Sequence, residues 1–575
     1  MDPRFTQASG LQAYTGVELL VKGALEGGVS LITGYPGSPV ADVFDAARAA
    51  KDYLEEHGIV AVLAHNEALA AARLNGSQMQ DIRAMAVMKS VGAHVASDAL
   101  AIGNLAKTGQ QGGALVVIGD DPWSDSTQVP ADSRYLASHI HMPVLEPSTF
   151  QELKDWVKTG FELSAKSNLY LAYLVTTNQA DGGAVVETRP NVPPKISRTH
   201  KVEIDTDSVP VEETVLLPPR TSRNEEQLHE RYRTLWGFAR DWGVNTVLGE
   251  PSNGHRAPIG LVAGGLAYCY LEHALRLLGL TGRFPILKLG ISYPVDPGIV
   301  QAFAGMVEKI VVIEEKRGFV ESQIVTILNH LLQGAEIAAH VPVWGKEFPM
   351  GLEGFPATRG LSPSLVMERL ARLLLRTGLL KDPAEIARAE EWLGLFDETA
   401  LYHVNIPART PTFCPGCPHR DSSAVLMEIK KDFRNADYMR KGHRRGPVDL
   451  VFHGDTGCYT MLMFEPTKAL MHNYSGIGLG GGTGAGIDPF ITNKQVVFMG
   501  DSTFFHSGMI AVSDAVKNHQ DIAFIILDNK TTAMTGHQPT PSVDVDMMGK
   551  PTFAQDIEQV LGGMTHGAGI DIVRA

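Results

Sequence analysis

The apolar residues of the first 180 positions gather in short continuous runs rather than in an alternating pattern. Between most of these runs lie segments with helical spacing, such as VADVFDAARAA at 40–50 and NEALAAARLNG at 66–76. Strands buried on both faces of a sheet read as continuous apolar runs, and intervening helices cover a parallel sheet. The pattern therefore predicts an α/β module at 1–180, with strands at 29–33, 59–64, 83–88, 114–119 and 169–175.

The pattern changes after residue 180 and divides the rest of the chain. Residues 181–254 are rich in proline and charge and predict a connector, although the stretch is too long for a simple loop. A second α/β block follows at 255–340, then a mixed spacer at 341–408 and a last α/β block at 409–575. A chain of 575 residues is too long for one core, so the prediction is a multidomain α/β protein.

Three predicted strands of the last block each end in an aspartate. Their sequences are VDLVFHGD, KQVVFMGD and DIAFIILDN, which end at or beside Asp455, Asp501 and Asp528. Open parallel sheets bind ligands at the carboxyl ends of their strands. These aspartates, together with Thr456 after the first of them, are therefore expected to face a ligand.

The most specific stretch of the chain begins at the second of these strand ends. Gly500-Asp501-Ser502 is followed, after 25 residues, by Asp528-Asn529. Asp501 and Asn529 offer the oxygen ligands that Mg²⁺ takes together with the oxygens of a diphosphate, and a glycine lets backbone approach phosphate closely. Either pair alone would be read as a simple turn after a strand. Together they predict a metal–diphosphate site, with further support from Thr531, Thr535 and Gly536.

Composition narrows the class of protein further. The net charge of −14 argues against a nucleic-acid binder, which needs a basic face. No apolar run approaches 18 residues, so no membrane span is expected, and MDPRFTQASG shows no secretory signal. Four cysteines in 575 residues do not make a disulfide framework, so the expected location is the reducing cytoplasm.

The metal–diphosphate stretch resembles the motif of thiamine diphosphate enzymes. That motif reads Gly-Asp-Gly and ends in an Asn-containing segment; here Ser502 replaces the last glycine, and Asp528-Asn529 stands for the usual Asn pair. The resemblance implies that Asp501, Asn529 and the backbone oxygen of Thr531 hold Mg²⁺. It also implies that cofactor contacts come from Gly500, Ser502, Thr535, Gly536, Asp455 and Thr456.

Thiamine chemistry also needs a carboxylate beside the aminopyrimidine ring, so that the cofactor can deprotonate its own thiazolium carbon. Glu67 follows a predicted strand and opens a helix made mostly of Ala and Leu. An apolar setting lets the proton affinity of a carboxylate be tuned. Taken alone, Glu67 could simply be a helix N-terminal glutamate favoured by the helix dipole. Taken with the diphosphate motif, it is the best catalytic candidate in the chain.

Several longer motifs are similar to one family in particular, the large (alpha) subunits of indolepyruvate ferredoxin oxidoreductases. They are TGYPGSPVADVFD, VMKSVGAHVASD, GDDPWSDSTQVPADSRY, FCPGCPHR, GDTGC, GDSTFFHSG and LDNKTTAMTGHQPTP. The resemblance runs from about residue 14 to the end. It implies a pyrimidine-binding domain at 1–180, a transketolase C-terminal-like domain at 255–340 and a diphosphate-binding domain at 409–575.

The resemblance implies an activity and partners. The reaction would be the oxidative decarboxylation of a 2-oxoacid, such as indolepyruvate, to an acyl-CoA, with electrons passing through an iron–sulfur cluster to ferredoxin or another acceptor. A small beta subunit and a homo-oligomer are expected. A non-redox thiamine decarboxylase or lyase that releases an aldehyde is the alternative, and a scaffold that kept only the fold is a second one.

Three of the four cysteines match the family's cluster ligands. In the wider family, a C-x-x-C pair and two further cysteines bind a [4Fe–4S] cluster. Cys414, Cys417 and Cys458 match three of these, while the fourth would fall beyond residue 575. Zinc with His419 or His453 as a further ligand, or no metal at all, remain alternatives. Cys269 lies in an apolar helical pattern and is expected to be a buried core residue.

Weaker signals concern the substrate. By resemblance, the TGYPGSP turn contacts substrate, with Ser38 donating to its carboxylate; the alternative is that Ser38 caps a helix. Lys89 could pair with the same carboxylate, or it could be an ordinary solvated lysine at a strand end. His537 closely follows the metal motif and is expected to face the pocket.

Overall fold

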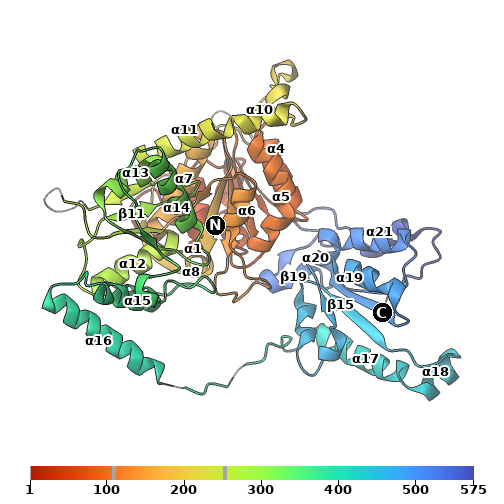
Figure 1. Cartoon of the computed structure of the whole chain (residues 1–575). Helices are drawn as coiled ribbons and strands as arrows, with labels where there is room; N and C mark the ends of the chain where they lie inside the picture. Colours follow the sequence, from red (N-terminus) through yellow and green to blue (C-terminus); the bar gives the residue numbers. More distant parts are fainter. Residues whose placement is uncertain (1, 107–111, 250–254, 403, 408, 575) are drawn as a thin grey trace. The chain divides into compact units, whose positions relative to one another are not determined.

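The computed structural model describes residues 2–106, 112–249, 255–402, 404–407 and 409–574. The chain divides into two compact units, Met1–Val404 and Asn405–Ala575, which are described separately (Figure 1). Both units have parallel sheets flanked by helices, so the predicted α/β class is confirmed. Within the described ranges, no helix is long and apolar enough to cross a membrane.

A seven-stranded sheet forms the centre of the first unit, in the order β12-β6-β7-β5-β4-β2-β3. The five strands predicted within 1–180 are confirmed as β2, β3, β4, β5 and β7, and all of their pairings with one another are parallel. The bounds are β2 (Leu31–Gly34), β3 (Val60–Leu63), β4 (Arg83–Lys89), β5 (Gly113–Asp120), β6 (Val144–Leu145), β7 (Leu171–Thr176) and β12 (Ile291–Tyr293).

Successive residues of a strand point to opposite faces of the sheet, and here both faces are apolar. Helices cover each face. Ala84, Ala86 and Met88 of β4 share a buried cluster with α4 (Glu67–Ser77) and α5 (Ser90–Leu105). Residue Leu115 of β5 belongs to the opposite set and lies against Gly160 of α7 (Phe150–Ser167), which packs beside α1 (Gly16–Glu26). Helices therefore pack on both faces of this sheet.

The stretch predicted as a connector, 181–254, carries regular elements up to residue 249; its last five residues lie outside the described part. β8 (Gly183–Glu187) pairs antiparallel with β1 (Leu11–Thr15). The helices α9 (Val211–Thr214), α10 (Arg220–Glu226) and α11 (Leu228–Asp241) follow. The strand β9 (Thr246–Leu248) then joins the edge of the next sheet. The polar stretch therefore contributes edge strands as well as a link.

A second, five-stranded sheet of the first unit has the order β14-β13-β10-β11-β9. Within the α/β block predicted at 255–340, the strands are β10 (Gly260–Gly264), β11 (Ile286–Leu289) and β13 (Ile310–Ile313). β14 (Val343–Trp344) completes the sheet. Its helices are α12 (Gly265–Leu277), α13 (Pro297–Met306), α14 (Phe319–Gln333), α15 (Pro363–Arg376) and α16 (Pro383–Ala400).

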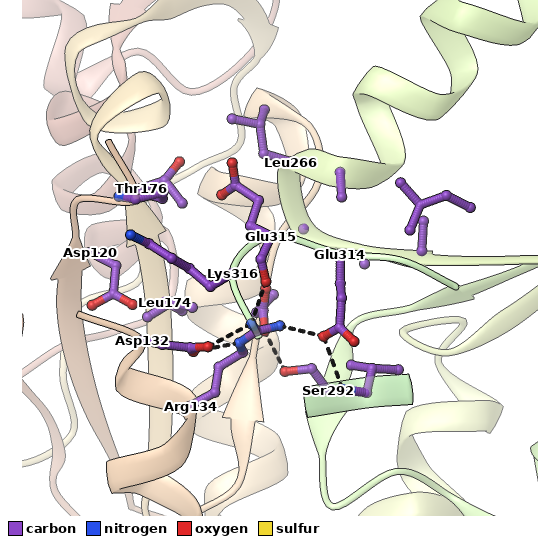
Figure 2. Close-up of a pocket in the computed structure, with 18 of the residues that line it drawn as sticks. Asp120, Asp132, Arg134, Leu174, Thr176, Leu266, Ser292, Glu314, Glu315 and Lys316 are labelled. Atoms are coloured by element: carbon purple, nitrogen blue, oxygen red, sulfur yellow. Dashed lines mark hydrogen bonds and ion pairs between the residues drawn. The ribbon is translucent and has the colours of Figure 1, made fainter. Parts of the chain in front are cut away.

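Two features join the sheets of the first unit. β12, which follows the second block's strand β11, pairs antiparallel with β6 at the edge of the seven-stranded sheet. Buried Arg134 of α6 (Ser133–His139) lies between the blocks, at the pocket drawn in Figure 2. Its guanidinium donates to Glu314 (3.0 Å), to the backbone oxygen of Glu315 (2.7 Å) and to Asp132 (2.7 Å).

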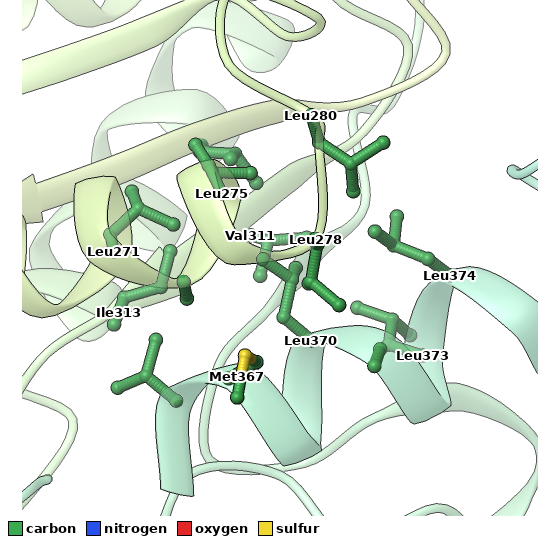
Figure 3. Packing of buried hydrophobic residues seen from close by; sticks show 14 of the residues in the cluster. Leu271, Leu275, Leu278, Leu280, Val311, Ile313, Met367, Leu370, Leu373 and Leu374 are labelled. Atoms are coloured by element: carbon green, nitrogen blue, oxygen red, sulfur yellow. The ribbon is translucent and has the colours of Figure 1, made fainter. Parts of the chain in front are cut away.

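The second block closes over an apolar cluster shown in Figure 3. Helix α12 contributes Leu271 and Leu275, and α15 faces it with Leu370 and Leu374. All four side chains are essentially inaccessible to solvent, as is Val311 of β13 beneath them. Burying side chains of this kind contributes about 2 kcal/mol each. The spacer predicted from 341 on therefore begins as part of this block's core.

The second unit is built on a four-stranded parallel sheet in the order β16-β15-β17-β18. Its three predicted strands are confirmed as β15 (Leu450–Gly454), β17 (Lys494–Gly500) and β18 (Ile522–Leu527), with β16 (Asn473–Tyr474) at one edge. The longer helices are α17 (Pro418–Phe433), α18 (Ala436–His443), α19 (Gly480–Ile487), α21 (Met509–Lys517) and α22 (Ile557–Thr565).

Candidate functional site

Asp501 occupies the mouth of β17, where the sequence places it. It opens the short helix α20 (Asp501–Thr503), and its side chain is buried. Its Oδ2 accepts hydrogen bonds from Thr540 Oγ1 (2.8 Å) and Ser542 Oγ (3.2 Å). Burial raises the pKa of Asp501 above its usual value. The two hydroxyls hold one oxygen in place and leave Oδ1 to face the neighbouring strand end.

Asn529 and the backbone of Thr531 bring two further oxygens to Asp501. The atom placed as its Oδ1 lies 3.1 Å from Asp501 Oδ1 and 2.9 Å from the backbone oxygen of Thr531. The same atom accepts a hydrogen bond from the Thr531 N–H at 3.3 Å, which suits an oxygen. An amide nitrogen there could donate to both neighbouring oxygens, whereas an oxygen needs a cation between them. Adjacent ligands of octahedral Mg²⁺ lie about 3 Å apart, so these three oxygens can hold that ion.

The segment behind Asn529 is a small hairpin. β19 (Thr531–Thr532) pairs antiparallel with β20 (Gln538–Pro539), and Thr535 Oγ1 donates to Gln538 Oε1 at 2.7 Å. Gly536 turns the chain with φ of +120°. Thr535 and Gly536 therefore brace the hairpin that presents the Thr531 carbonyl. His537 is exposed, and its position facing a pocket stays a prediction.

The outer aspartates of the sheet differ from Asp501. Asp528 is exposed and accepts a hydrogen bond from the Lys530 N–H (3.2 Å), so it turns the chain after β18. Asp455 is fully buried; one oxygen accepts from Tyr459 Oη and the other from the Gly480 N–H (3.2 Å). Burial raises the pKa of Asp455 to about 6. Asp455 thus ties the glycine-rich α19 to β15.

Glycine lets two backbones meet beside Asp455. A Cβ on Gly480 would lie 3.2 Å from Asp455 Oδ2, and one on Gly478 would lie 2.6 Å from Ser507 Cβ. Gly478 also has φ of +78°. Glycine at these two positions therefore lets the chain pass this close. Thr456 lies next to Asp455, and its Oγ1 is 2.8 Å from Tyr474 Oη of β16.

A π-helical turn at residues 504–508 follows α20 directly, and the sequence analysis did not foresee it. π-Bulges are rare and frequent at functional sites. The turn buries His506, whose Nδ1 lies 2.7 Å from Ser507 Oγ, and His506 lies close enough to Asp455 to lower its pKa. The motif GDSTFFHSG contains His506, but no apolar periodicity distinguishes a π turn from an α turn.

The cysteine pair forms a tight turn at the start of α17. The Cys417 N–H donates to the Cys414 carbonyl (3.1 Å), and Gly416 between them has φ of +74°. Burial raises the pKa of Cys458, and the thiols of Cys417 and Cys414 raise it further, so the three lie near one another. Across the described ranges, no three or more His, Cys, Asp or Glu side chains are arranged to hold a metal ion.

The contacts of the remaining cluster candidates bear on the alternatives. His453 is buried, with Nε2 2.9 Å from Gln495 Oε1 and Nδ1 3.4 Å from Thr483 Oγ1, so neither ring nitrogen is open to zinc. His419 packs edge-on against Phe413. Cys269, expected in the core, is only partly buried, and its thiol donates to the Ser148 carbonyl (3.0 Å). All four cysteines are free thiols.

Glu67 lies at the first position of α4, and only 4% of its surface is exposed. Asn66 caps the helix, accepting the Leu69 N–H at 2.9 Å. Gly92 of α5 faces the carboxylate, and a Cβ there would lie 2.4 Å from Glu67 Oε1. The helix-dipole explanation accounts for the position of Glu67, but it does not require burial or the glycine opposite.

Lys89 ends β4 beside the Gly/Pro turn. Its stem covers Gly37, where a Cβ would lie 2.8 Å from Lys89 Cδ, and its Nζ donates to the Ser126 carbonyl (3.2 Å). Burial lowers the pKa of Lys89, while the nearby Asp121 and Glu67 raise it. Lys89 is therefore not a freely solvated strand-end lysine. Nor does Ser38 cap a helix, since α2 (Val43–Ala49) begins five residues later.

Asp121, which the sequence analysis did not single out, organises the loop beside Lys89. Its Oδ2 accepts from the N–H groups of Ser126 (2.6 Å) and Thr127 (3.0 Å) and from Thr127 Oγ1 (3.0 Å). Its Oδ1 is buried without a hydrogen-bond partner in the described chain. The Ser and Thr five and six residues after an aspartate, in DPWSDST, were the available signal.

The chain is similar to known proteins over nearly its whole length. Residues 250–391 match the indolepyruvate oxidoreductase domain family, and residues 455–574 match the C-terminal TPP-binding domain family of thiamine pyrophosphate enzymes. The indolepyruvate oxidoreductase subunit IorA of Methanothermobacter marburgensis is 31% identical over 559 residues, covering 97% of this chain and 81% of the relative. The IorA subunit of Archaeoglobus fulgidus is 29% identical over 565 residues, covering 97% and 80%.

Among solved structures, the chain is distantly similar to a 2-oxoglutarate:ferredoxin oxidoreductase from Magnetococcus marinus with 2-oxoglutarate, coenzyme A and succinyl-CoA bound. The TM-score is 0.45 and the identity 15%, over 63% of this chain and 65% of the other. A likeness of this extent does not bear on the activity.

Proposed function

Since the chain belongs to the family of IorA subunits of indolepyruvate oxidoreductases, we propose that it decarboxylates an aryl pyruvate oxidatively and yields an acyl-CoA. The family makes it a thiamine diphosphate-dependent 2-oxoacid oxidoreductase subunit. The aryl substrate, coenzyme A and the final acceptor are the parts that we propose. Family membership disfavours the alternative of a non-redox lyase.

The observation that carries the proposal is the meeting of Asp501, Asn529 and the Thr531 carbonyl at the mouths of β17 and β18. The Asn529 atom lies 3.1 Å from Asp501 Oδ1 and 2.9 Å from the Thr531 oxygen, spacings that fit neighbouring ligands of Mg²⁺, and such an ion would neutralise a diphosphate. Gly500 adds backbone beside this point, because glycine permits close approach to phosphate. Ser502 adds a hydroxyl at the first turn of the helix. On the neighbouring strand β15, buried Asp455 accepts the Gly480 N–H and so fixes the glycine-rich α19 in place.

Thiamine, when bound, supplies a ring carbon that becomes a nucleophile and an electron sink for decarboxylation. Glu67 is the residue of this chain that would hold the proton of the aminopyrimidine. Its burial keeps the carboxylate out of bulk water, which strengthens a hydrogen bond to a ring nitrogen. Gly92 leaves the space that the carboxylate occupies.

Lys89 and Ser38 are the groups that would bind the carboxylate of the 2-oxoacid. Lys89 is oriented from two sides, by the Ser126 carbonyl and by the charge of Asp121. The Gly37 backbone packs on its stem, so the turn that carries Ser38 and the lysine form one surface. A partly buried, oriented ammonium can form a charge-assisted hydrogen bond to such a carboxylate.

Cys414, Cys417 and Cys458 would supply three of the four thiolates of a [4Fe–4S] cluster. Cys417 and Cys414 both raise the pKa of Cys458, which places the three thiols in one region, although within the described residues they are not arranged as they stand to hold a metal ion. The fourth ligand would come from outside these three. Electrons would leave to ferredoxin or another one-electron acceptor, in an assembly with a small beta subunit and a second copy of the chain.

The test uses the chain co-produced with its beta subunit under anaerobic conditions. We expect bound thiamine diphosphate, iron and sulfide, and reduction of methyl viologen that depends on indolepyruvate and coenzyme A. Glu67→Gln should keep the cofactors and lose at least a hundredfold in kcat, the scale of positioned proton transfer. Glu56→Gln, at an exposed glutamate of helix α3 (Lys51–Glu56), is the matched control.

Other outcomes would contradict the proposal. Aldehyde release without viologen reduction would make the protein a non-redox lyase. Unchanged turnover in Glu67→Gln would leave only a scaffold role for this chain. Full activity without iron would remove the cluster from the proposal.

A further inference from the structure

A strongly basic segment stands out in this acidic chain. Residues 430–446 contain seven Lys and Arg against two Asp, a local charge of +5, whereas the remaining residues sum to −19. The segment comprises the last turn of α17 and all of α18. The net charge of −14 for the whole chain does not reveal this local excess of positive charge.

Most of these cations face solvent. We call the exposed set the α18 basic surface; it consists of Lys431, Arg434, Arg440, Lys441, Arg444 and Arg445. Arg440 is 73% exposed and Arg434 64%. In Figure 1, α17 and α18 lie together at one edge of the second unit. The surface is therefore a local projection rather than a stripe across the molecule.

The surface is anchored, and its charge is only partly neutralised. Buried Lys430 donates to Asp449 and to the Leu450 carbonyl (both 2.7 Å), which fastens the end of α17 to the start of β15. Asp437 pairs with Arg440. Lys441, Arg444 and Arg445 form no ion pair within the described chain. Three exposed cations beside an anchored helix end thus have no acidic partner in the part of the chain that the structure describes.

We propose that the α18 basic surface docks a small acidic electron-carrier protein that receives the electrons of the reaction. The inference rests on the proposed function, because only an oxidoreductase needs such a partner. Helix α17 begins directly after Cys417 and has 16 residues, so the surface lies about 24 Å along the helix from the cysteine turn. A small domain about 30 Å across, seated on α18, spans that length.

The charge distribution also distinguishes between two kinds of negatively charged partner for the α18 basic surface, a nucleic acid and an acidic protein. A nucleic acid extends well beyond a patch of this size and would meet the −19 of the remaining chain. A compact acidic protein makes one local contact. Complementary charge raises association rates by tenfold to a thousandfold, and the effect falls with ionic strength. The carrier should therefore be recruited mainly through its association rate.

The experiment compares two acceptors in the assembled enzyme. The variant Arg440→Gln/Lys441→Gln/Arg445→Gln removes three exposed charges and keeps residues that tolerate helix and turn. The control Arg233→Gln/Lys381→Gln/Lys517→Gln removes three exposed charges elsewhere. Rates are measured with an acidic ferredoxin and with methyl viologen from 20 to 300 mM salt. We expect kcat/KM for ferredoxin to fall at least tenfold at low salt in the first variant, with a flatter salt dependence, and the methyl viologen rate to stay unchanged.

Each other outcome overturns the proposal. Ferredoxin kinetics equal to those of the control would show that the surface does not dock the carrier. An equal loss of rate with ferredoxin and with methyl viologen would show that the surface acts in assembly or in the reaction itself rather than in docking. Loss of oligonucleotide binding with normal ferredoxin kinetics would make it a nucleic-acid site. Absence of methyl viologen reduction by the unaltered enzyme would instead refute the proposed function, so the two failures are distinguishable.

Discussion

Gly92 of α5 lies directly opposite the Glu67 carboxylate of α4, so that a Cβ on Gly92 would stand 2.4 Å from Glu67 Oε1 and 2.7 Å from its Cγ. A larger side chain at this position can be accommodated only if the Glu67 side chain moves. The close packing of α4 on α5 is thus what holds the best catalytic candidate of the chain in one conformation.

This relationship predicts a specific effect of Gly92→Ala. The added methyl group displaces the Glu67 side chain, and we expect kcat to fall at least tenfold while thiamine diphosphate stays bound. Methyl viologen reduction and cofactor content measure the two quantities. Gly76→Ala in α4 is the control, because a Cβ there meets nothing within 4 Å and alanine favours the helix by about 1 kcal/mol. Equal kinetics in the two variants would contradict the assignment of Glu67.

The oxygens of Asp501 and Asn529 predict that the affinity for thiamine diphosphate depends on Mg²⁺. Asn529→Ala and Asp501→Asn each remove a ligand oxygen, so we expect thiamine diphosphate affinity in Mg²⁺ to fall at least tenfold. Calorimetric titration in Mg²⁺ and in excess chelator measures the difference. Exposed Asn518, whose side chain donates to Asp514 at the surface, serves for a control Asn518→Ala. Chelator-insensitive binding by the unaltered chain would rule out the metal site.

Much of the fold could be predicted because its central strands are buried on both faces. β4 and β5 read as continuous apolar runs for this reason. β9 and β12 were missed, because strands of three residues at sheet edges carry too little apolar pattern to be recognised. Their pairing depends on partners distant in sequence, which no local pattern reports.

The site shows the same division between local and long-range information. The 25-residue spacing predicted Asp501 and Asn529 together, since it reflects one helical crossover between adjacent parallel strands. Gly92 and Asp121 could not be assigned, because their roles exist only through contacts with Glu67 and with the loop beside Lys89. The cysteine turn was visible from its spacing, but whether it holds a cluster was not.

The turn between Cys414 and Cys417 predicts an effect on iron content. Gly416 has φ of +74° and an open surrounding, so Gly416→Ala costs only the strain of a left-handed alanine, about 1 kcal/mol. We expect the second unit to stay folded and its iron per chain to fall. Circular dichroism and iron analysis separate the two. Gly446→Ala, with ordinary φ and nothing near its Cβ, should keep its iron. Equal iron in both variants would argue against ligation by this pair.

The burial of Arg134 between the two blocks of the first unit predicts that the free energy of unfolding falls when this cation is removed. Arg134→Met leaves the carboxylates of Asp132 and Glu314 buried without their partner, which costs about 3–5 kcal/mol of unfolding free energy. Urea unfolding followed by circular dichroism measures the loss. Arg233→Met, at an arginine that is 63% exposed, should change the same quantity by less than about 0.5 kcal/mol. Similar stability of both variants would mean that the cluster contributes nothing.

Glu315 predicts a pH dependence with a definite sign. Burial raises its pKa from 4.5 to about 7, although the Leu361 N–H bond and Arg134 oppose the shift. The folded state therefore binds the proton more tightly than the unfolded state does. The resulting stabilisation is present below pH 4.5 and is lost as the pH rises through 7, a difference of at most about 3 kcal/mol.

Glu315→Gln removes this titration while keeping an oxygen that can accept the Leu361 N–H. We expect the variant to match the unaltered chain at pH 5 and to be more stable at pH 8, because only the glutamate must ionise there in a buried site. Urea unfolding at both pH values tests this, with Glu308→Gln, at a glutamate that is 53% exposed, as the control. A stability difference that does not change with pH would show that Glu315 ionises normally in the folded protein, and its burial would then need another explanation.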